Sequence, residues 1–261
     1  MDKNVLAAMA RWPNVPDVFG WLSLSERGQW RLHPLGDALS TRQSVTDGTS
    51  AQAGLQQQDQ AEPSRLNDAG ESITSPQILQ FINHNYAHDT QGQWFFQNGP
   101  QRVFVRLDAA PYILQTAGHV NETDSILALQ THNGLNVNTI SAWYLDEAGR
   151  LYALTEHGPG LIAGRDLMTV LAALYTSEGQ NLVELLEHNP ARPDITITTM
   201  LCTNAAARTV DPAQPLNSPL RITTTKTQAP LKYCAASEIP GLMGFVRYPR
   251  KNMVTVLNQV E

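Results

Sequence analysis

The chain has 261 residues, 42% of them hydrophobic, which is enough for one large domain or two small ones with a real core. Its formal net charge is -6 and it has no basic run, so the sequence predicts neither nucleic-acid binding nor binding to an anionic membrane surface. No stretch approaches the roughly 18 apolar residues of a membrane span, and the first residues lack a signal-peptide pattern. We therefore expect a cytoplasmic protein.

The first third of the chain predicts a helix, a hairpin and an insertion. Residues 5–11 have a short helical pattern, and residues 21–24 and 29–32 indicate a hairpin around Gly28. Residues 40–67 are rich in Gln, Ser, Thr, Asp and Ala and contain almost no large apolar side chains. Such a segment cannot offset its own ordering entropy, so we expect a mobile insertion there.

The middle of the chain predicts a helix followed by an antiparallel meander. Ser75 followed by Pro76 is typical of a helix start, and apolar residues at helical spacing extend the helix from about 76 to 86. Beyond it, β-branched and aromatic runs are punctuated by glycine and proline, as in sheet proteins. The expected strands are residues 94–97, 101–107, 112–116, 125–131, 139–145 and 151–155.

The last part of the chain predicts two helices and more strands. Apolar residues at helical spacing mark one helix between Leu167 and Leu174 and another between Leu182 and Leu186. Beyond Pro190, strand-like segments are joined by proline-rich loops. The expected strands there are residues 195–200, 220–225, 245–248 and 253–257.

Three short stretches share one pattern: a polar residue, a glycine three positions later and a large apolar residue two positions after that. They are residues 25–30, 89–94 and 146–151. Glycine supplies the positive φ of a tight turn, and Ser or Asp bonds back onto turn amides. The pattern therefore predicts the same β-turn three times, and its reuse predicts a fold assembled from related units.

These elements together predict an α+β protein with antiparallel sheets built from repeated hairpin-plus-helix units. We expect residues 1–175 to form the repeated-unit domain and residues 176–261 to form a smaller helix-plus-β region.

Residues 92–103, with the sequence GQWFFQNGPQRV, resemble the signature of a proteobacterial family of uncharacterised proteins. The similarity extends to residues 12–16, 20–22, 81–86 and 146–149, and covers roughly residues 10–175. The chain is also distantly similar to another uncharacterised bacterial family, whose known structures repeat a hairpin-and-helix unit. The resemblance implies this repeated architecture, and neither family brings an activity.

Two histidines raise the question of a metal site. His84 and His88 stand four residues apart, with Asp89 beside the second, and on a continuous helix both imidazoles would share a face. The turn expected at Asp89 would interrupt that helix, and no third ligand is evident. We therefore expect no metal and keep these three residues as the candidate ligands.

The strand at residues 101–107 suggests a binding surface. Alternation places Arg102, Phe104 and Arg106 on one face, opposite a Val-Val-Leu face that is the natural core side. An aromatic ring between two guanidinium groups suits a carboxylate or phosphate ligand. The alternative is a solvated face whose arginines pair with acidic neighbours such as Asp108.

His132 and His157 lie in turn-like sequences near strand ends, where loops carry function. No phosphate-binding loop, dinucleotide fingerprint or nucleophile elbow occurs, so we expect no cofactor. Cys202 and Cys234 match no zinc spacing; they allow one disulfide, but two inert thiols in a reduced protein are the preferred interpretation.

Our leading hypothesis is a non-catalytic binding or regulatory module for an acidic small molecule or a protein partner, with Arg102, Phe104, Arg106, His132 and His157 as candidate binding residues. One alternative is a hydrolase-like enzyme with a site of His132, His157 and acidic residues at strand ends. Another is a structural or oligomerisation subunit. A deep cleft with clustered titratable groups would favour the enzyme, whereas a shallow basic-aromatic face would favour binding.

Overall fold

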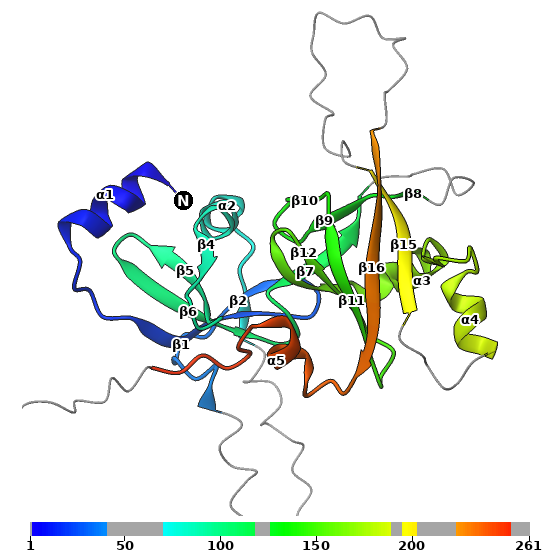
Figure 1. Ribbon diagram of the computed structural model, residues 1–261. Helices are drawn as coiled ribbons and strands as arrows, with labels where there is room; N and C mark the ends of the chain where they lie inside the picture. Colours follow the sequence, from blue (N-terminus) through cyan, green and yellow to red (C-terminus); the bar gives the residue numbers. More distant parts are fainter. Residues whose placement is uncertain (1, 41–69, 118–125, 189–194, 203–222, 252–261) are drawn as a thin grey trace, which may run out of the picture. The chain divides into compact units, whose positions relative to one another are not determined.

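A computed structural model describes residues 2–40, 70–117, 126–188, 195–202 and 223–251. Helices and extended sheets occur together, which confirms the α+β class (Figure 1). Apart from Ser40, the expected insertion at residues 40–67 lies outside the described residues, as does the expected strand at residues 253–257. Within the described ranges, no helix is long and apolar enough to cross a membrane.

The chain divides into two compact units near Asp108, and the last described residues, from Val246 on, belong to the first unit. This division differs from the expected one at residue 175. The reason is strand pairing: β15 (Ile195–Cys202) and β16 (Thr224–Cys234) extend the sheet begun by the strands before residue 175, because β16 pairs with β11 (Ile140–Asp146).

The first unit contains a six-stranded sheet in the order β3-β2-β1-β6-β5-β4. Its strands β1 and β6 are parallel, whereas the other neighbours are antiparallel. The intervening chain is long enough for the crossover that a parallel pair needs. The elements are α1 (Lys3–Arg11), β1 (Val18–Leu24), β2 (Trp30–Leu32), β3 (Glu71–Ser72), α2 (Pro76–His84), β4 (Tyr86–His88), β5 (Trp94–Asn98) and β6 (Gln101–Leu107).

The second unit contains a larger sheet in the order β10-β9-β7-β13-β12-β11-β16-β15-β14, with β8 paired to β15. Parallel pairs again interrupt the antiparallel pattern, between β7 and β13, β11 and β16, and β8 and β15, so the sheets are mixed. The remaining elements are β7 (Tyr112–Thr116), β8 (Ile126–Leu127), β9 (Leu129–Thr131), β10 (Asn136–Val137), β12 (Leu151–Thr155), β13 (Gly158–Ile162), η3 (Gly164–Asp166), α3 (Leu167–Ala172), β14 (Tyr175–Thr176), α4 (Leu182–His188) and α5 (Ile239–Met243).

Cys202 and Cys234 are both free thiols. Cys202 ends β15 and pairs with Thr224 at the start of β16, whereas Cys234 is the last residue of β16. The two cysteines therefore lie at opposite ends of the β15–β16 hairpin, too far apart for a disulfide.

The three turns anticipated from the sequence share one geometry. Gly28, Gly92 and Gly149 have φ values of 78°, 75° and 77°. In the last turn, the Asp146 Oδ1 atom accepts from the Ala148 and Arg150 amides at 3.0 and 2.8 Å. The Asp89 Oδ1 atom and the Ser25 Oγ atom accept from turn amides in the same way.

Two further turns have the same geometry and begin with threonine. The Thr131 Oγ1 atom accepts from the Leu135 amide and the Thr176 Oγ1 atom from the Gln180 amide, at 2.9 and 3.1 Å. A glycine of positive φ stands three residues after each threonine. A short oxygen-bearing side chain followed by glycine thus recurs in five turns, of which the turns at Ser25, Asp89, Thr131 and Asp146 join two strands and the turn at Thr176 leads from β14 to α4.

We predict that Gly149→Ala lowers the free energy of unfolding by about 1–3 kcal/mol, because a side chain at this positive φ is strained. Open space surrounds a Cβ built at Gly149, so strain is the only new cost. Gly164→Ala is the control, since Gly164 has equal space and no positive φ. Equal denaturation midpoints for the two variants would contradict the assignment of a positive φ to Gly149.

Candidate functional site

Helix α2 forms one wall of the candidate site. Ser75, in an extended conformation, precedes Pro76 at the first helical position, where a missing N–H costs nothing. The helix ends at His84, and the side-chain amide of the next residue, Asn85, donates to the Phe81 carbonyl at 3.0 Å. The Phe81 ring meets the Phe96 ring of β5 edge to face at 5.4 Å, and Ile82 is buried, so these contacts fix α2 on one face of the sheet.

Between α2 and this sheet lies a pocket of about 700 Å³, which we call the α2 pocket. Its volume is within the range of small-molecule sites in proteins. Thirteen described residues line it, and ten of these are apolar. These ten are Val18, Trp21, Leu22, Leu32, Ile73, Ile78, Phe81, Ile82, Phe96 and Val103.

Four exposed apolar side chains surround the α2 pocket. Trp21, Leu32, Ile78 and Phe81 are 43%, 40%, 51% and 37% exposed. Among the described residues, ten large apolar side chains are exposed, and these four gather at one place. A clustered apolar surface of this kind marks a binding site more often than scattered single residues do.

The polar part of the α2 pocket is small and uncharged. Gln77, Asn98 and Gln101 are the polar residues among the described residues that line it. Asn98 and Gln101 are register partners on β5 and β6, so their side chains share one face. The Gln101 Nε2 atom donates to the Pro16 carbonyl at 3.1 Å. These amides can hydrogen-bond the polar end of a ligand but cannot neutralise a charge.

Arg102, Phe104 and Arg106 share one face of β6, on the side opposite Val103 and α2. A binding surface would need this face to be open, but the structure shows that it is largely covered. Phe104 is 3% exposed and its ring stacks on Phe19 at 4.6 Å. Arg102 lies over the Phe95 ring at 5.0 Å.

Arg106 is buried and holds a loop onto the sheet. Its Nη1 atom donates to the Ala38 carbonyl at 2.7 Å, and its Nε atom donates to Asp108 at 3.2 Å. The buried pair of Ser23 and His33, at 2.8 Å, fastens the same loop. Arg106 thus pairs with Asp108, as the alternative interpretation of this face expected, but it is buried and not solvated.

His132 is half-buried in the second unit, and its Nε2 atom is buried. Its Nδ1 atom accepts from the Ile113 amide at 3.3 Å, and its ring lies 5.8 Å from that of Tyr112. Burial lowers the pKa of His132 to about 3 and raises the pKa of Tyr112 to about 12. The histidine is therefore neutral in the folded protein at physiological pH.

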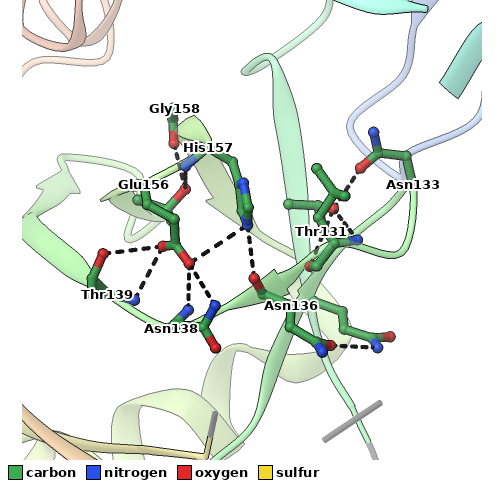
Figure 2. A network of polar contacts seen from close by, with 11 residues as sticks. Thr131, Asn133, Asn136, Asn138, Thr139, Glu156, His157 and Gly158 are labelled. Carbon is green, nitrogen blue, oxygen red and sulfur yellow. Dashed lines mark hydrogen bonds and ion pairs between the residues drawn. The ribbon is translucent and has the colours of Figure 1, made fainter. Parts of the chain in front are cut away.

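His157 belongs to a loop network that Figure 2 shows. Its Nε2 atom donates to the Asn136 carbonyl at 2.7 Å and lies 3.6 Å from Glu156. Burial opposes ionisation of Glu156, but hydrogen bonds from the Asn138 and Thr139 amides outweigh it and lower its pKa. This network ties one loop to the next, which is a structural role.

The rings of His132 and His157 both lie near Tyr112, at 5.8 and 6.5 Å from its ring. Neither histidine lines the α2 pocket or the second pocket described below. The two histidines belong to the second unit, whereas Arg102, Phe104 and Arg106 belong to the first.

The candidate metal ligands are separated by the end of a helix. His84 is the last residue of α2, and His88 lies on β4 beyond Asn85. The His88 Nδ1 atom bonds to the Asp89 carbonyl, and Asp89 accepts from turn amides. Within the described ranges, no three His, Cys, Asp or Glu residues are grouped as metal ligands.

Sequence reasoning did not single out the α2 pocket. Trp21 is interpretable as a core residue from its neighbours, and Ile78 lies at the helical spacing that predicts packing on a sheet. One feature of the sequence does point to the pocket. The apolar stripe on α2 is wider than the sheet covers, because it includes the exposed Ile78 and Phe81 as well as the buried Ile82.

A known protein family matches nearly the whole chain. The model of family DUF2944, described as a protein of unknown function (DUF2946), matches residues 1–250. The chain belongs to this family. Membership of an uncharacterised family is thereby confirmed, and a comparison with curated proteins gave no match.

Two solved structures are similar to this DUF2944 family chain. A DUF1285 family protein from Silicibacter pomeroyi DSS-3 has 15% identity and a TM-score of 0.35, over 60% of this chain and 72% of that one. A DUF1285 family protein from Shewanella baltica OS155 has 12% identity and a TM-score of 0.36, over 59% and 92% of the two chains.

We predict that His132 makes the protein acid-sensitive. Its folded pKa of about 3 lies below its unfolded value of about 6.5, so the unfolded state binds the extra proton between these values. Stability should therefore fall as the pH drops below about 6.5, by up to about 1.4 kcal/mol per unit from this group. Denaturant unfolding at several pH values measures the slope.

The variant His132→Gln removes this titration and should flatten the slope, whatever its stability at neutral pH. Equal slopes for the two proteins would show that His132 is not held neutral by burial.

Proposed function

We propose that the first unit is a non-catalytic binding module and that the α2 pocket takes the apolar part of a small molecule. The observation that carries this proposal is the gathering of Trp21, Leu32, Ile78 and Phe81, all exposed, around one pocket of about 700 Å³. Burying these side chains under a ligand removes apolar surface from water, at about 25 cal/mol for each Å².

The lining favours a ligand whose pocket-facing part is neutral. No cationic residue belongs to the described lining, and the three polar members are amides. A carboxylate or phosphate in apolar surroundings without a cation is costly. The acidic ligand that the arginines suggested therefore has no support in the α2 pocket, whereas an apolar body with a hydrogen-bonding end does.

Three finer interpretations belong to the same proposal. The stretch from Gly92 to Val103 is the signature of the family, and its members are proteobacterial. The recurring turn reflects internal repetition of a hairpin unit, supported by the common geometry at Ser25, Asp89 and Asp146. A cytoplasmic location is supported by the two free cysteines, which suit a reducing compartment.

The test uses phenylnaphthylamine, a neutral apolar dye that fluoresces when it leaves water. We expect saturable binding to the wild-type protein and about tenfold weaker binding to Ile78→Ser, because the variant loses apolar contact area. Ile78 is 51% exposed, so the substitution should change stability by about 0.5 kcal/mol or less.

Leu6→Ser is the matched control, since Leu6 also lies on a helix of the first unit, is also 51% exposed and does not line the α2 pocket. Its affinity for the dye should equal that of the wild type. Absence of saturable binding, or equal losses in both variants, would overturn the proposal.

A further inference from the structure

A second pocket of about 520 Å³ lies on the other side of the same sheet, and we call it the Phe19 pocket. Val18 lines the α2 pocket, and Phe19 is the next residue of β1, so the two side chains point to opposite faces. The Phe19 ring stacks at 4.6 Å on Phe104, which also lies on this opposite face. The Phe19 pocket is thus distinct from the site proposed above.

The Phe19 pocket combines aromatic walls with positive charge. Phe19 and Tyr248 contribute rings, Pro249 and Leu39 contribute apolar surface, and Arg250 and Lys251 contribute two adjacent cations. No carboxylate belongs to the described lining. Within the part of the chain that the structure describes, no ion pair occupies Arg250 or Lys251.

The segment that carries the cations is held in place by the sheet and its turns. The Val246 amide donates to the Gly92 carbonyl and the Leu107 amide to the Arg247 carbonyl, both at 2.9 Å. The Arg250 amide donates at 2.7 Å to the Oε1 atom of Gln93, which is buried. Three anchors over five residues fix the backbone at Arg250, so its side chain starts from a defined position.

We propose that the Phe19 pocket binds a small anion with a planar ring, the ring against Phe19 and Tyr248 and the anionic group at Arg250 and Lys251. Arginine binds carboxylates, sulfonates and phosphates through paired N–H donors and also stacks on flat groups. The two cations and the aromatic rings together select for both features of such a ligand. The chain as a whole carries a net charge of -6, so this local pair, and not the overall charge, attracts the anion.

The test compares two dyes that share one ring skeleton. Anilinonaphthalene sulfonate carries a negative charge, and phenylnaphthylamine is the same skeleton without it. We expect the double variant Arg250→Gln/Lys251→Gln to bind the sulfonate about tenfold more weakly, because charge-assisted hydrogen bonds are lost. Binding of the neutral dye should not change.

The matched control is Lys226→Gln/Lys232→Gln, which removes the same charge from two exposed lysines of β16. It should leave sulfonate binding at the wild-type level. Ile78→Ser should weaken the neutral dye and leave the arginine- and lysine-dependent part of sulfonate binding intact. The two proposals can therefore fail separately. If Ile78→Ser does not weaken binding of the neutral dye, the proposed function of the α2 pocket fails. If Arg250→Gln/Lys251→Gln does not weaken binding of the sulfonate, the inference about the Phe19 pocket fails.

Two outcomes would overturn the inference. One is sulfonate affinity that does not respond to Arg250→Gln/Lys251→Gln in protein that retains the wild-type thermal midpoint. The other is an equal loss in the β16 control, which would assign the effect to overall charge.

Discussion

Neighbouring residues of β6 point to opposite faces of the first sheet, and both faces are buried. Phe104 and Val105 are 3% and 0% exposed, and Arg106 and Leu107 are 8% and 0% exposed. A sheet with one wet face would alternate between buried and exposed residues. This two-sided burial is the constraint on which the rest of the first unit depends, because each face needs its own cover.

The two covers differ in chemistry. On one face α2 packs with Ile82 and Phe81, and it leaves part of the apolar surface uncovered as the α2 pocket. On the other face, Arg106 and Ser23 hold a loop through buried hydrogen bonds. A buried guanidinium group is stable only when its charge and its donors are paired. Arg106 therefore needs the Ala38 carbonyl, and this hydrogen bond holds the loop against the sheet.

Local features of the fold were predictable from the sequence. The helix at residues 76–86 begins at Pro76 as expected, and the turns at Gly28, Gly92 and Gly149 follow from spacing alone. The shared face of Arg102, Phe104 and Arg106 also follows from alternation. Extending the turn pattern to threonine would have found the turns at Thr131 and Thr176, since a hydroxyl oxygen accepts as a carboxylate does.

The rest depends on contacts between residues far apart in the chain. The partner of Arg106 is the Ala38 carbonyl, 68 positions away, and no local pattern reveals it. The α2 pocket likewise joins Trp21, Ile78 and Val103 from separate elements. Helical spacing predicts that Ile78 packs on a sheet, but only the finished arrangement shows that α2 leaves it exposed at 51%.

The α2 pocket is the proposed binding site for a neutral apolar ligand. The most direct measurement follows the backbone amide chemical shifts of isotope-labelled protein during titration with phenylnaphthylamine. We expect the largest shifts on the pocket walls, at Leu22, Ile78, Phe81 and Val103. Shifts that fall mainly outside the α2 pocket, or no saturable shifts, would contradict it.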